Sequence, residues 1–174
     1  MGKWNVAKKT TPYSVLPEEE MRKHRCAFTG HRPEKINRSV TEVQEALRYS
    51  IYQSIEDGFA VFITGMARGV DLWAAEIILD LRKKQDIRLI CAVPFEGFET
   101  QWSSEWKKIY RSVLKRADFV YVVGKTYSHD IFSRRNMWMV NHAKRIIAVY
   151  DGTPGGTRNT IAYAHKSNVE VIIL

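Results

Sequence analysis

Cysteine is scarce in this chain, with two residues among 174. Cys26 and Cys91 each lie inside an apolar run of strand length, so we expect buried thiols in a reducing compartment and no disulfide framework. No set of His, Cys, Asp or Glu residues has the spacing of a metal site. The sequence therefore predicts no metal ion and no cofactor.

Long apolar runs are also missing. No window approaches the roughly 20 apolar residues that cross a bilayer. The segment from Met1 to His24 has no apolar core of the signal-peptide type. We therefore expect a cytoplasmic protein with no membrane partner.

Acidic residues are in the minority. The chain has 27 Lys and Arg against 19 Asp and Glu, a formal net charge of +8. This balance favours anionic partners such as nucleotide phosphates or a nucleic acid, but the basic residues are scattered and form no block. Simple solubility explains the charge equally well.

Three familiar sequence motifs do not occur. No glycine turn continues into the Lys-Ser/Thr of a P-loop, and the first strand is not followed by Gly-x-Gly-x-x-Gly. The Gly-x-Ser-x-Gly elbow of the hydrolases is absent too. These absences exclude three common kinds of nucleotide or catalytic site.

Short apolar runs alternate regularly with helical patterns after residue 24. The runs predict strands at 25–29, 59–64, 87–93, 119–123, 145–150 and 169–174, with helices between them. Because the runs are apolar on both faces, the prediction is an α/β fold: one doubly wound, mainly parallel six-stranded sheet flanked by helices over residues 25–174. Residues 1–24 have no sustained period and are expected to be an extension that packs on this domain or stays mobile.

The unusual residues cluster after strands. An unusual segment follows each of the first five predicted strands, at residues 30–32, 65–71, 94–97, 124–127 and 151–157, whereas the opposite loops around Gly58, Asp86 and Asn168 are plain turns. Ligands bind at this edge of an open parallel sheet, near the point where strand order reverses. The pattern therefore predicts a binding cleft at the carboxyl edge of the sheet.

The chemistry of these turns favours a phosphate. The turn from Gly65 to Asp71 precedes a helix, and helix N-termini bind anions through free amides. Gly155 and Gly156 open another helix in the same way. The predicted ligand-binding residues are Gly30, His31, Arg32, Gly65, Arg68, Gly69, Asp71, Gly155, Gly156 and Thr157.

Several side chains in these turns allow two interpretations. His31 either hydrogen-bonds a ribose or phosphate, or moves a proton near neutral pH, or packs beside Pro33 as a structural side chain. Asp71 either caps its helix or accepts from a sugar hydroxyl. Phe95, Phe98 and Tyr127 either stack on a base or serve as packing residues.

With these motifs in view, the chain from Arg25 to Leu174 resembles the SLOG superfamily of Rossmann-like domains, closest to its YpsA-like branch. The motifs are Thr29-Gly-His-Arg-Pro, Gly65-Met-Ala-Arg-Gly-Val-Asp-Leu-Trp-Ala-Ala-Glu, Pro94-Phe, and Gly155-Gly-Thr. The superfamily includes DprA, which binds single-stranded DNA, and LOG-type phosphoribohydrolases, which cleave nucleoside monophosphates. The resemblance implies a Rossmann-like fold and a nucleotide-type ligand.

The chain departs from the LOG pattern at one point. In that pattern an acidic residue follows Pro-Gly-Gly-x-Gly-Thr, but here Gly156 continues into Thr157-Arg-Asn-Thr. Glu76 and His31, with Glu96 as a further carboxylate, are the remaining catalytic candidates. We therefore predict binding of a nucleotide or nucleotide-derived small molecule, with N-glycosidic hydrolysis and single-stranded DNA binding as alternatives.

The predicted helix around Phe132 to Val140 is unusually aromatic. Its apolar residues, including Trp138, extend beyond one face. A homo-oligomer or burial under the N-terminal extension would each explain this pattern. Oligomeric state is therefore left open.

Overall fold

The structure, a computed structural model, describes residues 16–174. Its strands are β1 (Arg25–Gly30), β2 (Val61–Thr64), β3 (Arg88–Phe95), β4 (Phe119–Gly124), β5 (Arg145–Val149) and β6 (Glu170–Ile173). Its helices are α1 (Glu18–Arg22), α2 (Val40–Glu56), α3 (Val70–Leu81), α4 (Ser104–Arg116), α5 (Ile131–Asn141) and α6 (Gly156–Lys166), with a short 3₁₀ turn, η2 (Pro33–Lys35).

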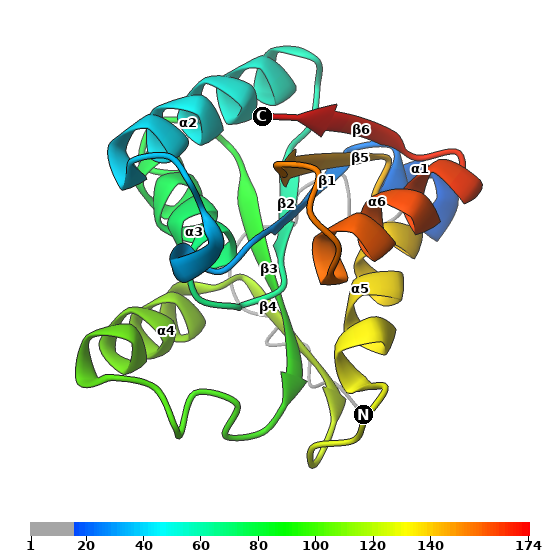
Figure 1. Ribbon diagram of the computed structural model, residues 1–174. Helices are drawn as coiled ribbons and strands as arrows, with labels where there is room; N and C mark the ends of the chain where they lie inside the picture. Colours follow the sequence, from blue (N-terminus) through cyan, green and yellow to red (C-terminus); the bar gives the residue numbers. More distant parts are fainter. Residues whose placement is uncertain (1–15) are drawn as a thin grey trace.

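The six strands form one sheet in the order β4-β3-β2-β1-β5-β6, and every neighbouring pair is parallel. Figure 1 shows α2, α3 and α4 on one face of this sheet and α5 and α6 on the other. This is the predicted doubly wound, Rossmann-like arrangement. The chain moves outward from β1 to β4 and then returns to place β5 on the other side of β1, so strand order reverses between β1 and β5.

Local signals in the sequence account for the individual elements. At α2, the Ser39 side chain accepts a bond from the Glu42 amide at 3.2 Å, and the Glu42 carboxylate accepts from the Ser39 amide at 2.9 Å. This reciprocal capping box starts the helix where the sequence pattern predicted it. Strand β3 continues through Pro94, because Phe95 still lies in register with Gly124 of β4. The predicted end at residue 93 was therefore two residues short.

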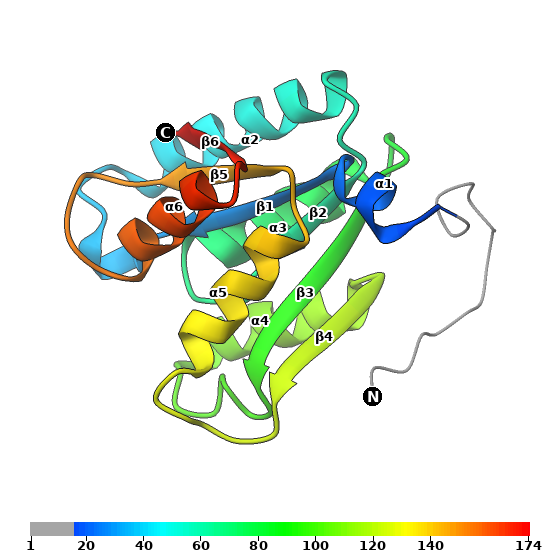
Figure 2. The same ribbon diagram turned by 90° about the vertical axis from the view of Figure 1, so that its right-hand side faces the viewer.

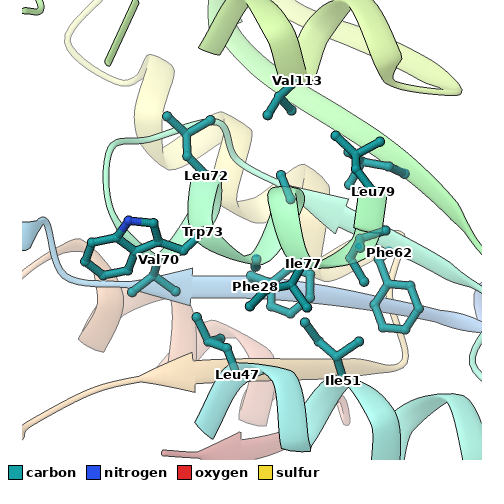
Figure 3. Packing of buried hydrophobic residues seen from close by; sticks show 14 of the residues in the cluster. Phe28, Leu47, Ile51, Phe62, Val70, Leu72, Trp73, Ile77, Leu79 and Val113 are labelled. Atoms are coloured by element: carbon teal, nitrogen blue, oxygen red, sulfur yellow. The ribbon is translucent and has the colours of Figure 1, made fainter. Parts of the chain in front are cut away.

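The larger core cluster lies between the sheet and α2, α3 and α4. Figure 3 shows Phe28 and Phe62 of the sheet between Leu47 and Ile51 of α2 and residues of α3. On the opposite face, Ala27, Ile63, Ala92 and Ile146 of the sheet pack with residues of α5 and α6. Helix α5 therefore lies close to the sheet on the side where the cleft opens.

The segment before β1 packs on the domain where the structure describes it. Arg22 donates from Nε to the Ala143 carbonyl at 3.0 Å, and Arg25 of β1 forms an ion pair with Glu18 of α1. Residues 1–15 of the predicted extension lie outside the described residues. The boundary between extension and domain stays a prediction.

No helix within residues 16–174 is long and apolar enough to cross a membrane.

Candidate functional site

A cleft of about 410 Å³ opens at the carboxyl edge of the sheet, at the reversal between β1 and β5. Its size lies within the range of small-molecule sites. Its lining comprises Phe28, Thr29, Gly30, His31, Arg32, Lys35, Ala67, Asp71, Phe98, Phe132, Arg135, Asn136, Met139, Pro154, Gly155, Gly156 and Thr157. Seven of the ten predicted ligand-binding residues are therefore brought together, the exceptions being Gly65, Arg68 and Gly69.

The turn after β1 supplies a histidine and a cation. Arg32 and Lys35 are exposed at the cleft, and Arg32 makes no side-chain hydrogen bond or ion pair with any described residue. His31 is buried, with Nε2 at 3.0 Å from Asp151 Oδ1 and 3.2 Å from Thr153 Oγ1. His31 therefore ties the β1 turn to the β5 turn across the strand reversal.

The turn after β5 leads into the N-terminus of α6. Gly155 is the N-cap residue and offers no side-chain cap, so the first amides of α6 are free of the bonds that a Ser or Asp cap would make. The preceding loop is fixed by Asp151, which accepts from the Thr153 hydroxyl at 2.7 Å and from its amide at 3.0 Å. These bonds hold the pKa of Asp151 below its ordinary value. The turn is thus a preformed cradle for an anion.

Two backbone amides of the turn after β2 are bonded within the turn. The Met66 amide donates to Thr64 Oγ1 at 3.3 Å, and the Ala67 amide donates to Asp71 Oδ2 at 3.1 Å. Asp71 therefore braces the turn instead of capping α3 at its N-cap position, which is Gly69. Side chains of the turn itself therefore take up these two amides, and Ala67 and Asp71 line the cleft.

Arg135 of α5 is the cation that sequence reasoning missed. It is buried beneath the cleft, donates through Nη1 to the Gly65 carbonyl, and lies 3.8 Å from Asp71 Oδ2. A Cβ atom on Gly65 would clash with Arg135 Nη1, so the glycine leaves room for this guanidinium. The sequence does contain one signal that Arg135 is buried. Its helical spacing from Ile131 and Met139 places all three residues on one face of α5, and that face is buried.

Burial shifts the pKa values of Asp71 and Arg135 in opposite directions. Loss of water raises the pKa of the Asp71 carboxyl, because nearby Arg135 and the Ala67 amide offset that loss only in part. Loss of water also lowers the pKa of the Arg135 guanidinium, which stays a cation. Asp71 is therefore engaged by its own protein and is not a free base in the cleft.

The remaining predicted residues lie away from the cleft lining. Arg68 pairs with Glu34 at 2.7 Å. Gly69 has a φ of 87° and lies where an added Cβ would be 2.8 Å from Pro33 Cδ, so it allows the β1 turn to pack on α3. Glu76 is exposed and faces a hollow between α2 and α3. Glu76 therefore does not reach the cleft.

The three loop aromatics lie differently with respect to the cleft. Phe98 lines the cleft together with Phe28 and Phe132. Phe95 packs edge-on against Phe98 and Phe132, with ring centroids 5.4 and 6.2 Å apart. Tyr127 is 62% exposed and lies outside the cleft lining. The cleft lining therefore contains both aromatic and cationic side chains.

Among residues 16–174, no group of three or more His, Cys, Asp or Glu side chains is placed to hold a metal ion.

A family model described as the YspA SLOG family, YpsA, matches residues 26–171. This match covers most of the chain, including every turn of the cleft. The chain belongs to the YpsA family.

Two Bacillus proteins share moderate sequence identity with the chain. The chain is similar to the uncharacterised SPbeta prophage-derived protein YoqJ of Bacillus subtilis strain 168, with 34% identity over 119 residues that cover 61% of this chain and 70% of YoqJ. It is also similar to a UPF0398 protein of Bacillus thuringiensis strain Al Hakam, with 28% identity over 154 residues, which cover 83% of this chain and 84% of that protein.

A solved structure shares the fold of this YpsA family member. DNA processing protein A from Helicobacter pylori, whose structure is described as revealing a single-stranded DNA binding mode, superposes with a TM-score of 0.63 at 16% identity. The likeness covers 90% of this chain and 66% of that one. At this identity the comparison shows the common fold alone.

Proposed function

We propose that this protein binds the phosphate of a nucleotide, or of a nucleotide-derived small molecule, in the cleft between β1 and β5. The observation that carries the proposal is that one cleft is lined both by a helix N-terminus without a side-chain cap and by Arg32, which has no ion-pair partner within residues 16–174. The free amides of α6 and the helix dipole favour an anion there. Arg32 adds a guanidinium fork that matches phosphate oxygens.

The aromatic part of the cleft lining suits the base of a nucleotide. Phe98 and Phe132 contribute partly buried rings to this lining, whereas Phe28 is buried in the core. Aromatic side chains stack on nucleobases with little dependence on the base. His31 and Asn136 also line the cleft and offer polar groups to a ribose.

Hydrolysis of an N-glycosidic bond receives no support from the arrangement of carboxylates. Asp71 is the one carboxylate among the described residues that line the cleft, and its Oδ2 is occupied by the Ala67 amide. Glu76 and Glu96 are exposed and lie outside the lining. We therefore propose a binding protein and no catalytic role for these residues.

Single-stranded DNA binding is the second candidate function. It is favoured by the fold shared with DNA processing protein A and by the net charge of +8. Such binding rests on phosphate neutralisation and base stacking, so its affinity falls steeply as salt rises. Affinity for an oligonucleotide that does not change between dilute and physiological salt would count against it.

Calorimetric titration with the common nucleoside monophosphates and inorganic phosphate tests the proposed function. We expect saturable binding of at least one nucleotide. Arg32→Ala should weaken it by about tenfold to a hundredfold, since a bond to a charged group contributes about 1.5–3 kcal/mol.

Arg48→Ala is the matched control for that titration. Arg48 is an exposed arginine of α2 whose side chain lies 3.5 Å from Asp80 and outside the cleft. Its removal should leave nucleotide affinity unchanged. Equal losses in the two variants, or no nucleotide binding by the wild type, would contradict the proposal.

A further inference from the structure

A second hollow lies beside the cleft. It has a volume of about 450 Å³ and runs between α5 and α6, which Figure 2 shows side by side on one face of the sheet. Phe132, Asn136 and Gly156 line both the cleft and this α5–α6 groove. The two hollows are therefore one continuous surface, with the start of α6 at their junction.

The lining of the α5–α6 groove is mostly apolar, with a few polar groups. Met137 and Tyr163 supply its apolar surface, and Met137 is 41% exposed. Tyr163 donates its hydroxyl to Asn141 Oδ1 at 3.0 Å, a bond that holds the ring in place. A half-exposed methionine beside a fixed tyrosine ring is a surface suited to a flat ring-shaped group.

Asn136 contributes a hydrogen-bond donor at the junction. Its side-chain oxygen accepts from Arg135 Nε at 2.7 Å, and an arginine can only donate. The carboxamide oxygen is thereby committed to the buried arginine, and the NH₂ group is the part that remains for a ligand. This orientation places a donor where the two hollows meet.

From these contacts we infer that the ligand is a dinucleotide unit, with its phosphate at the α6 N-terminus and one base in each hollow. The inference rests on the proposed function, because it uses the same phosphate cradle. Each of the two hollows that share Gly156 has a partly buried aromatic ring in its lining, Phe98 in the cleft and Tyr163 in the groove. A mononucleotide would leave the second surface empty.

A dinucleotide unit can come from two sources. It can be a free dinucleotide, or it can be two consecutive nucleotides of a single nucleic-acid strand. The experiment uses the four nucleoside monophosphates and their homodinucleotides, joined either by one phosphate or by a pyrophosphate. Preference for the pyrophosphate link indicates a free dinucleotide, and preference for the single phosphate indicates a strand. Titrations are made with the full-length protein at constant salt.

We expect a dinucleotide to bind about tenfold more tightly than the corresponding mononucleotide, because it stacks one further base on an aromatic ring. Tyr163→Ala should abolish this gain and leave mononucleotide affinity unchanged. Tyr163→Phe keeps the ring and should keep the gain. Tyr49→Ala, which removes a tyrosine that is 68% exposed on α2, is the control outside both hollows.

Met137→Glu is a second variant, which places bulk and negative charge in the groove without touching the Tyr163–Asn141 bond. It should also remove the gain. Mononucleotide binding without any dinucleotide gain, or a gain that survives both variants, would overturn this inference and leave the proposed function standing. Absence of binding by every probe would overturn both.

Discussion

At the scale of single residues, the cleft depends on a buried cation that the linear sequence conceals. Arg135 and Asp71 are far apart in the chain, yet their charged groups meet at 3.8 Å beneath the turn at Gly65. The sequence predicted Gly65 and Asp71 as ligand contacts because glycine and acid at a strand-to-helix turn are typical of nucleotide sites. The structure gives both residues an internal partner that the sequence did not reveal, since only the three-dimensional fold brings α5 under that turn.

The Arg135–Asp71 pair should show strong energetic coupling. Arg135→Met leaves a buried carboxylate without its cation and should lower the free energy of unfolding by about 3–5 kcal/mol. In the double variant with Asp71→Asn, the loss should be smaller than the sum of the two single losses, by about 0.5–3 kcal/mol. Urea unfolding of the four proteins at neutral pH measures this difference. Losses that add within experimental error would show that the two groups act independently.

At the scale of secondary-structure elements, the six strands and the helices between them were predictable. Continuous apolar runs and helical spacing are local properties, and the Ser39–Glu42 capping box confirms how closely local chemistry sets the start of α2. The roles of the glycine turns were less predictable. Whether an amide is free depends on neighbouring side chains, and Thr64 and Asp71 take up the amides of Met66 and Ala67.

Helix α6 offers an element-scale test, because its N-terminus has no cap of its own. A carboxylate at Gly156 would occupy the position proposed for the phosphate, and an added Cβ there meets no atom within 4 Å. Gly156→Asp should therefore keep or slightly raise the melting temperature, since an acid at a helix N-terminus contributes about 0.3–1 kcal/mol. It should also lower nucleotide affinity by about tenfold or more, through like-charge repulsion.

Gly156→Ala is the matched control for the added charge, because it adds a methyl group and keeps the backbone amide. Its nucleotide affinity should stay close to that of the wild type. Thermal melts and calorimetric titration of the two variants separate folding from binding. If Gly156→Asp binds nucleotides as tightly as Gly156→Ala, the phosphate does not lie at α6.

At the scale of the whole molecule, strand order explains why distant segments form one site. The sequence predicted that unusual residues gather at the carboxyl edge of the sheet, and the order β4-β3-β2-β1-β5-β6 places the β1 and β5 turns on either side of the reversal. Strand order itself could not be derived from the chain, because each strand is apolar on both faces and pairs equally well with several neighbours. The α5–α6 groove was not predicted from the sequence either, because it forms only when the two helices pack side by side on the sheet.

The account rests on one claim, that the α6 N-terminus, and not the β2–α3 turn, holds the phosphate. Heteronuclear NMR of the ¹⁵N-labelled protein, titrated with nucleoside monophosphates and with inorganic phosphate, tests it at the amides themselves. We predict saturable shifts of the Gly156 and Thr157 amides, with smaller shifts of Met66 and Ala67, whose amides already donate within the protein. Shifts that are largest at Met66 and Ala67, or no saturable shift at Gly156 and Thr157 with any titrant, would contradict the claim.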